Sequence, residues 1–222
     1  MNIFFLGTGA ADYKPCHRDL PGFRRNASAL VNGELLIDPG PCVPDALESF
    51  GKAPTDIRFI LNTHRHKDHL NPETVSFLEE NGAKLITFED GETKQLGNFC
   101  VTALRGNHSI HVQHFLISDG EKTLFYGLDS SWLLYEEIQA LKQGVDLAVL
   151  DCTVGFITGD YRVFEHCSAD MILTMAPAMR EYVKRICISH MARTLHTDHE
   201  TLAARMGAHG IEVAFDGLML DI

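Results

Sequence analysis

The chain has 222 residues, 45% of them hydrophobic, which is enough to bury a sizeable core in one large domain or two small ones. Its formal net charge of −11 argues against a long nucleic-acid footprint, because such proteins usually carry a basic face. The N-terminus lacks the basic region of a signal peptide and no stretch is long enough for a membrane span, so we expect a cytoplasmic protein with no membrane partner.

Short apolar runs separated by turn residues predict a strand-rich first half. The expected strands are 2–6, 27–31, 34–37, 57–62, 84–88 and 99–104, and the expected helices are 44–50 and 72–81. Asn32-Gly33 is a strong signal for a two-residue hairpin turn between the second and third strands. No linker or charge block interrupts the chain, so we expect one domain over residues 1–222.

The second half repeats the mixture of strands and helices. The expected strands are 112–118, 122–128, 147–151 and 185–189, and the expected helices are 132–142, 169–178 with 174–182, and 197–208. Pro177 predicts a break in the second of these helices, and Thr197 with Glu200 has the spacing of a capping box for the third. Two strand-rich halves, each followed by helices, predict two packed sheets with helices outside.

The run from Thr63 to His69 carries the strongest chemical signal. It places His64, His66, Asp68 and His69 directly after a buried strand. In an extended or tightly turned segment the first three project to one side, and we expect His69 at the start of a helix. Imidazole and carboxylate groups suit zinc and manganese alike, so this loop predicts a metal site without choosing the metal.

Three further ligand types follow apolar strands, where loop residues gather into sites. They are His108, Asp129 and His190. The other six histidines fit no motif and are expected to be solvated or satisfied in the core; they are His17, His111, His114, His196, His199 and His209. The six cysteines lack C-x-x-C spacing and are expected to be reduced and buried.

In this combination the motifs resemble the metallo-β-lactamase superfamily, as do the segments Leu6-Gly-Thr-Gly9 and Ile37-Asp-Pro-Gly40. The resemblance implies an α/β (α+β) fold, a four-layer αββα sandwich, with two divalent ions at one sheet edge. It implies that one ion is held by His64, His66 and His108, and the other by Asp68, His69 and His190. Asp129 is implied to bridge the two ions.

Within the superfamily the chain resembles the phosphodiesterase-like branch, namely phosphoribosyl cyclic phosphodiesterases and ribonuclease Z-like enzymes. Arg25-Asn-Ala-Ser28, Leu150-Asp-Cys-Thr153 and Glu165-His-Cys-Ser168 stand where those proteins carry related motifs. This implies that His166 protonates the leaving oxygen and that Asp151 holds it in place; the lactonase branch is expected to lack such a histidine.

The chain also departs from that pattern. The stretch between His69 and His108 is too short for the arm with which ribonuclease Z grips tRNA, so a large nucleic acid is not the expected substrate. The cysteine-rich zinc loop of the cyclic phosphodiesterases is reduced to Cys16-His17, which leaves an N-terminal zinc in doubt. The segment from Pro15 to Arg25 is instead open as a substrate-facing lid or a dimer contact, and homodimers are the commonest soluble assembly.

The expected activity is hydrolysis of a small or cyclic phosphodiester by hydroxide bound between two zinc or manganese ions. Asp68 could orient that hydroxide, and His166 would act as general acid. Arg193 and Arg25 could contact a phosphate oxygen, although an ordinary salt bridge explains each equally well. Two alternatives stay open at this point: a lactone, thioester or carboxylic ester hydrolase on the same core, and a metal-binding module without turnover.

Overall fold

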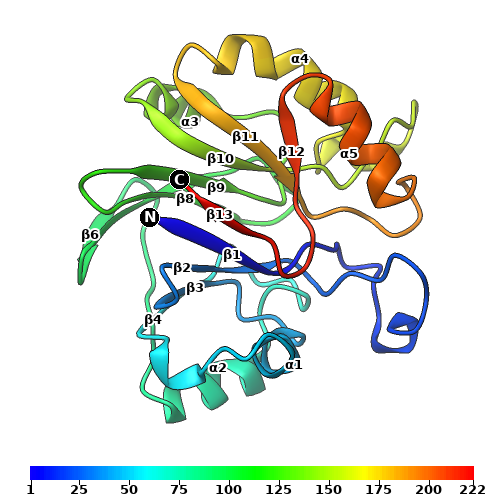
Figure 1. Cartoon of the computed structure of the whole chain (residues 1–222). Coiled ribbons are helices and arrows are strands. Elements are labelled where there is room, and N and C mark those ends of the chain that lie inside the picture. The colour runs from blue at the N-terminus through cyan, green and yellow to red at the C-terminus, as the bar shows by residue number, and fades with distance from the viewer.

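Two β-sheets pack face to face, and helices cover the outer face of each (Figure 1). This computed structural model describes residues 1–222, apart from the side chain of Pro15. Helices α1 (Val43–Ser49) and α2 (Pro72–Glu80) lie on the first sheet, and α3 (Tyr135–Leu141), α4 (Ala169–Met179) and α5 (His199–Gly207) lie on the second. Three short 3-10 helices lie at Pro15–His17, Pro54–Asp56 and Tyr161–Phe164. The predicted four-layer αββα sandwich is therefore confirmed.

The first sheet has the strand order β13-β1-β2-β3-β4-β5. Its strands are β1 (Asn2–Gly7), β2 (Ser28–Val31), β3 (Leu35–Ile37), β4 (Phe59–Leu61), β5 (Lys84–Leu85) and β13 (Met219–Asp221). The β2–β3 hairpin predicted around Asn32-Gly33 is present, and both turn residues have the positive φ that such a turn requires. Strands β3, β4 and β5 run parallel, so their carboxyl ends meet at one edge.

The second sheet has the strand order β12-β11-β10-β9-β8-β7-β6. Its strands are β6 (Thr93–Leu96), β7 (Phe99–Arg105), β8 (Gln113–Ser118), β9 (Thr123–Gly127), β10 (Val145–Asp151), β11 (Val183–Ser189) and β12 (Ile211–Val213). Strands β9 to β12 are parallel, while β6 to β9 are antiparallel. The parallel part again brings carboxyl ends to one edge, which faces the corresponding edge of the first sheet.

The main core lies between the sheets. In β1 the side chains alternate: Ile3 and Phe5 enter this core, while Phe4 packs outward against Phe50 after α1. Burying a side chain of this size stabilises the fold by roughly 1.5–3 kcal/mol. A second apolar layer lies under α3, α4 and α5, and a third lies under α1 and α2.

Several local predictions were wrong. His69 does not begin a helix but lies in a turn whose amide bonds to the His66 carbonyl, and α2 starts only at Pro72. Helix α4 continues through Pro177, because a proline in the last turn removes a single intrahelical bond. The cap of α5 is Asp198, which accepts from the Thr201 amide, and not Thr197. Strands β6, β12 and β13 were not predicted at all.

Candidate metal centre

The Thr63–His69 loop follows β4 and is pressed against the turn after β3. A Cβ added at Gly40 would lie 2.1 Å from the backbone oxygen of Asp68, so only glycine permits this approach. The amide of Asn71 also bonds to the carbonyl of Pro39. The Asp38-Pro-Gly40 turn therefore sets the path of the histidine loop.

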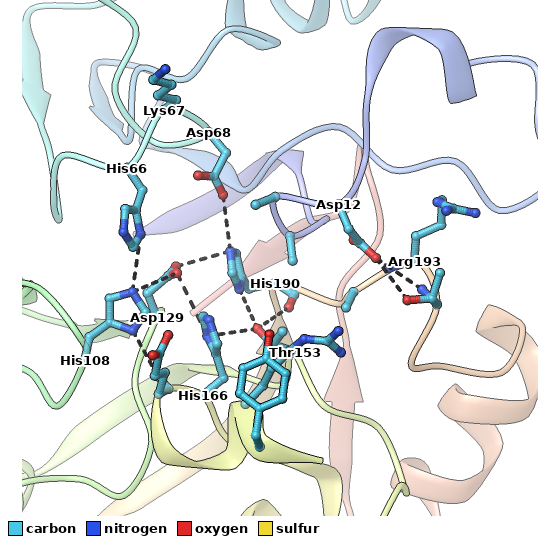
Figure 2. Close-up of a pocket in the computed structure, with 17 residues that line it drawn as sticks. Asp12, His66, Lys67, Asp68, His108, Asp129, Thr153, His166, His190 and Arg193 are labelled. Carbon is cyan, nitrogen blue, oxygen red and sulfur yellow. Dashed lines mark hydrogen bonds and ion pairs between the residues drawn. The ribbon is translucent and has the colours of Figure 1, made fainter.

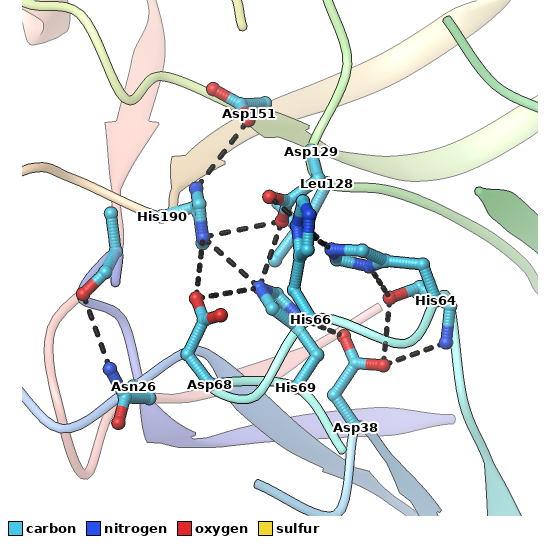
Figure 3. A network of polar contacts seen from close by, with 12 residues as sticks. Asn26, Asp38, His64, His66, Asp68, His69, Leu128, Asp129, Asp151 and His190 are labelled. Carbon is cyan, nitrogen blue, oxygen red and sulfur yellow. Dashed lines mark hydrogen bonds and ion pairs between the residues drawn. The ribbon is translucent and has the colours of Figure 1, made fainter. Parts of the chain in front are cut away.

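Three histidines and one carboxylate form the first group of donors. His64 Nε2 lies 2.9 Å from His66 Nδ1, and His108 Nε2 lies 3.3 Å from the same atom (Figures 2 and 3). With Asp129, these side chains offer donor atoms that all lie within 4.8 Å of one another. The histidine loop and the loop after β7 thus contribute to the same point.

A second group lies beside the first and is formed by Asp68, His69 and His190. The Nε2 atoms of His69 and His190 are 3.1 Å apart, and Asp68 Oδ2 lies 3.3 Å from the former. Asp129 Oδ2 lies 2.9 Å from His69 Nε2 and 3.2 Å from His190 Nε2 (Figure 3). The structure therefore brings together all seven residues predicted as ligands, with Asp129 next to both groups.

The unsatisfied carboxylate at the centre indicates what this arrangement is suited to hold. Asp129 is 2% exposed, and its Oδ2 has no hydrogen-bond partner within the part of the chain that the structure describes. The Nε2 atoms of His69 and His190 converge on it at 2.9 Å and 3.2 Å, so polar donor atoms crowd together at the centre of the cluster. A carboxylate oxygen among imidazole nitrogens is a donor set for divalent zinc or manganese, and such ions would satisfy these atoms.

Burial and charge shift the pKa values in this cluster in opposite directions. Burial lowers the pKa of His64 to about 2, which keeps its imidazole neutral. Burial also acts to lower the pKa of His190, but Asp129 and the carboxylates near it outweigh this and raise the value to about 10. Burial raises the pKa of the Asp129 carboxyl, yet the imidazoles of His190 and His69 hold it well below its ordinary range.

Backbone strain concentrates here. Three of the four non-glycine residues with positive φ belong to the site: Asp38 (61°), Asp129 (54°) and His190 (62°). Left-handed backbone costs an L-residue roughly 1–2 kcal/mol. Such strain persists where surrounding contacts hold it in place, and it clusters at functional sites.

Two supporting residues were missed by sequence reasoning. Asp38, fully buried, accepts from His69 Nδ1 at 2.8 Å and from the amide and hydroxyl of Thr63, also at 2.8 Å. Thr153 Oγ1 lies 2.7 Å from His190 Nδ1 and 3.1 Å from His166 Nδ1. The Ile37-Asp-Pro-Gly40 motif was noted as a family likeness, and only the fold shows that its aspartate orients a predicted ligand.

His166 and Asp151 lie together beside the donor cluster. His166 Nδ1 is 2.7 Å from Asp151 Oδ2, and the ring stacks on His190 with a centroid separation of 5.5 Å. Burial acts to lower the pKa of His166, but the Asp151 carboxylate outweighs it and raises the pKa above its ordinary value. Since Nδ1 is held by Asp151, the ring nitrogen left to face a substrate is Nε2.

Five of the seven donors line a pocket of about 470 Å³, namely His66, Asp68, His108, Asp129 and His190. Three cationic side chains, Lys67, Arg162 and Arg193, also line it, and Asp12 fixes the last of these by accepting from its backbone amide at 2.8 Å (Figure 2). His166 lines the same pocket. Donor residues, His166 and three cationic residues therefore line one pocket.

Comparison with solved structures identifies the fold. The metallo-β-lactamase fold protein YhfI from Bacillus subtilis superposes with a TM-score of 0.78 at 16% identity, covering 99% of this chain and 98% of that one. A diphosphatase from the PhnP family gives 0.76 at 19% identity, covering 100% and 97%. The short form of human tRNase Z gives 0.74 at 19% identity, covering 100% and 99%. The chain has the metallo-β-lactamase fold.

Sequence comparison reaches less far. A family model described as anti-Pycsar protein Apyc1 matches residues 1–77 of this metallo-β-lactamase-fold chain. No curated protein sequence matches it significantly. Among the described residues, none of the helices has the length and apolar character needed to cross a membrane.

Not every predicted site residue reaches the pocket of this metallo-β-lactamase-fold protein. Arg25 lies outside it: its guanidinium bonds to Asp45 at 2.8 Å and lies over the ring of Phe50. Its neighbour Arg24, which was not singled out, bonds to the Thr8 hydroxyl and is 8% exposed. Arg25 therefore forms a salt bridge away from the pocket, whereas Arg193 lines the pocket.

Proposed function

We propose that this chain is a metal-dependent hydrolase that cleaves a small or cyclic phosphodiester. The donor cluster fits two divalent ions, zinc or manganese, in the two groups described above. When bound there, such ions act as Lewis acids that activate water and stabilise negative charge on a phosphate. The similar structures include a diphosphatase and a tRNase Z, which supports hydrolysis at phosphorus as the first class to test.

The observation that carries the proposal is the position of His166. An acid is needed where the alkoxide leaves, and His166 lies in the wall of the pocket with its Nδ1 bonded to Asp151 at 2.7 Å. The Asp151 carboxylate raises the pKa of His166 above its ordinary value, which favours the protonated ring that a general acid needs. A thioester expels a thiolate and has less need of such an acid, whereas carboxylic esters and lactones expel an alkoxide as phosphodiesters do, so only the substrate panel separates those classes.

The remaining residues of the pocket have simpler roles. Asp68 lines the pocket, and its Oδ2 lies 3.3 Å from His69 Nε2. In this position the Asp68 carboxylate could both hold an ion and orient the attacking water. Arg193 and Lys67 add positive charge beside the site, which favours an anionic substrate. The volume of about 470 Å³ favours a small molecule over a folded nucleic acid.

The test is hydrolysis of bis(p-nitrophenyl) phosphate by protein loaded with zinc or manganese. On a phosphodiester with an alkyl leaving group, His166→Ala should lower kcat by roughly 10²–10⁴-fold while the bound metal, counted by elemental analysis, stays the same. The loss on bis(p-nitrophenyl) phosphate should be smaller, because p-nitrophenolate leaves with little need of a proton. His111→Ala is the matched control, because His111 is an exposed histidine paired with Asp90. No turnover of any phosphodiester by the fully loaded protein would overturn the proposal. Turnover in a parallel panel of lactones and thioesters would then indicate an ester hydrolase. Full metal loading without turnover of any substrate would indicate a metal-binding module.

A further inference from the structure

We propose that His114 and Glu137, which lie behind the donor cluster, are a positioning pair that sets the conformation of Asp129 and so the affinity of the centre for metal. The inference rests on the proposed metal site but not on the choice of phosphodiesters as substrates. Neither residue touches the pocket. Their influence would pass through the peptide that precedes Asp129.

The pair is buried and tied to two elements. His114 lies on β8 and Glu137 on α3, and both are 0% exposed. Glu137 Oε1 contacts His114 Nδ1, while its Oε2 accepts from the Leu134 amide at 2.7 Å, at the start of α3. Both carboxylate oxygens are therefore engaged, and the imidazole is anchored to the first turn of a helix.

The other ring nitrogen reaches the backbone next to Asp129. His114 Nε2 donates to the carbonyl of Leu128 at 2.9 Å. Strand β9 ends at Gly127, so this carbonyl lies just beyond the end of the strand. The angle φ of Asp129 is the rotation of that residue relative to the Leu128–Asp129 peptide plane. An anchored Leu128 oxygen thus holds that plane, and with it the left-handed φ of 54° that Asp129 adopts.

Two glycines leave room for the ring. A Cβ at Gly106 would lie 2.6 Å from His114 Nε2, and a Cβ at Gly127 would lie 3.2 Å from His114 Nδ1. Gly106 belongs to the loop that carries His108, and Gly127 precedes the turn that carries Asp129. The ring is therefore in close contact with the backbone of two loops that bear predicted ligands.

The charge state fits this geometry. Nε2 must carry a proton to bond the carbonyl, and a proton on Nδ1 lets it bond the Glu137 carboxylate as well. Burial acts to lower the pKa of His114, but the Glu137 carboxylate outweighs it and raises the pKa above its ordinary value. An imidazolium between a carboxylate and a carbonyl makes two charge-assisted bonds, which are stronger and more directional than neutral ones.

The test compares metal affinity in four variants. Glu137→Gln and His114→Leu should each weaken zinc binding, measured by competition with a chromophoric chelator, by about 10- to 100-fold, the usual effect of changing a partner that supports a ligand. His114→Gln keeps an amide donor towards Leu128 and should recover part of that loss. His111→Gln, which breaks the exposed pair with Asp90, is the matched control and should leave the affinity unchanged.

Thermal unfolding of the metal-free variants separates positioning from folding. A variant that folds with normal stability yet binds zinc at wild-type affinity would overturn the proposal. So would a loss of affinity that merely follows the loss of stability, with no recovery in His114→Gln. These measurements need no phosphodiester substrate. A failure of the proposed phosphodiesterase activity would therefore not be mistaken for a failure of the positioning proposal.

A measurement on the unmodified protein covers the case in which the variants do not fold. In wild type labelled with ¹³C and ¹⁵N, both ring N–H protons of His114 should be visible and protected from exchange, with and without zinc. Fast exchange or a missing Nε2 proton would contradict the bond to Leu128. A shift of the Leu128 carbonyl carbon on zinc addition is the expected sign of coupling, and an unchanged shift would count against it.

Discussion

Asp38→Asn tests how strongly the residues behind the ligands control the centre. The substitution replaces one carboxylate oxygen by an NH₂ group and keeps the size of the side chain. In the wild type, Asp38 Oδ2 accepts from His69 Nδ1 at 2.8 Å, which leaves the Nε2 lone pair directed at the donor cluster. Asp38 Oδ1 accepts two further hydrogen bonds, one from the Thr63 amide and one from the Thr63 hydroxyl, and the substitution can leave both in place.

The side-chain amide introduced by Asp38→Asn reverses the tautomer that the His69 imidazole prefers. An NH₂ group facing His69 Nδ1 favours the tautomer with the proton on Nε2, where it blocks coordination. Both side chains are 0% exposed, so water cannot take over the lost role. Changes to such partners typically lower metal affinity by about 10- to 100-fold, which corresponds to roughly 1.4–2.8 kcal/mol.

The assay is competition for zinc with a chelator of known affinity, together with the metal content after dialysis. We expect Asp38→Asn to bind zinc more weakly than the wild type. Of the two proposed ions, one should be affected more than the other. Asp90→Asn is the control, since Asp90 also pairs with a histidine, His111, but at an exposed position. Equal affinity and equal stoichiometry in wild type and Asp38→Asn would refute the tautomer argument.

Three more predictions concern stability and protons. Gly40→Ala places a Cβ 2.1 Å from the backbone oxygen of Asp68, so it should lower the free energy of unfolding by about 1–3 kcal/mol in a denaturant titration; an unchanged midpoint would contradict the close approach. Because the pKa of His190 is raised to about 10 in the metal-free protein, zinc binding near neutral pH should release a proton, and calorimetry in buffers of different ionisation enthalpy should detect it. The pKa of His114 is raised in the folded protein, so the stability it contributes is fully present below about pH 6.5 and is lost as pH rises through the folded value. The difference in unfolding free energy between wild type and His114→Gln should therefore shrink with rising pH, and a difference that grows would reverse the assigned sign.

The sequence by itself determined the local features of this protein. Ligand types directly after apolar strands, such as Asp129 and His190, could be recognised because strand ends and turn residues leave short-range signals. The hairpin at Asn32-Gly33 and the layered fold followed from the same kind of pattern. These features depend on neighbours a few residues apart, which a linear chain displays directly.

The tertiary structure alone decided the contacts between distant segments. Strand β13 is short and exists because it pairs with β1 at the other end of the chain, where Asn2 faces Asp221. The bonds from Asp38 to His69 and from His114 to Leu128 likewise join residues on different elements. Arg25 looked equally suited to a phosphate or a salt bridge, and only the placement of α1 gave it Asp45. Such partners lie close in space but far apart in sequence, so no local pattern could have shown them.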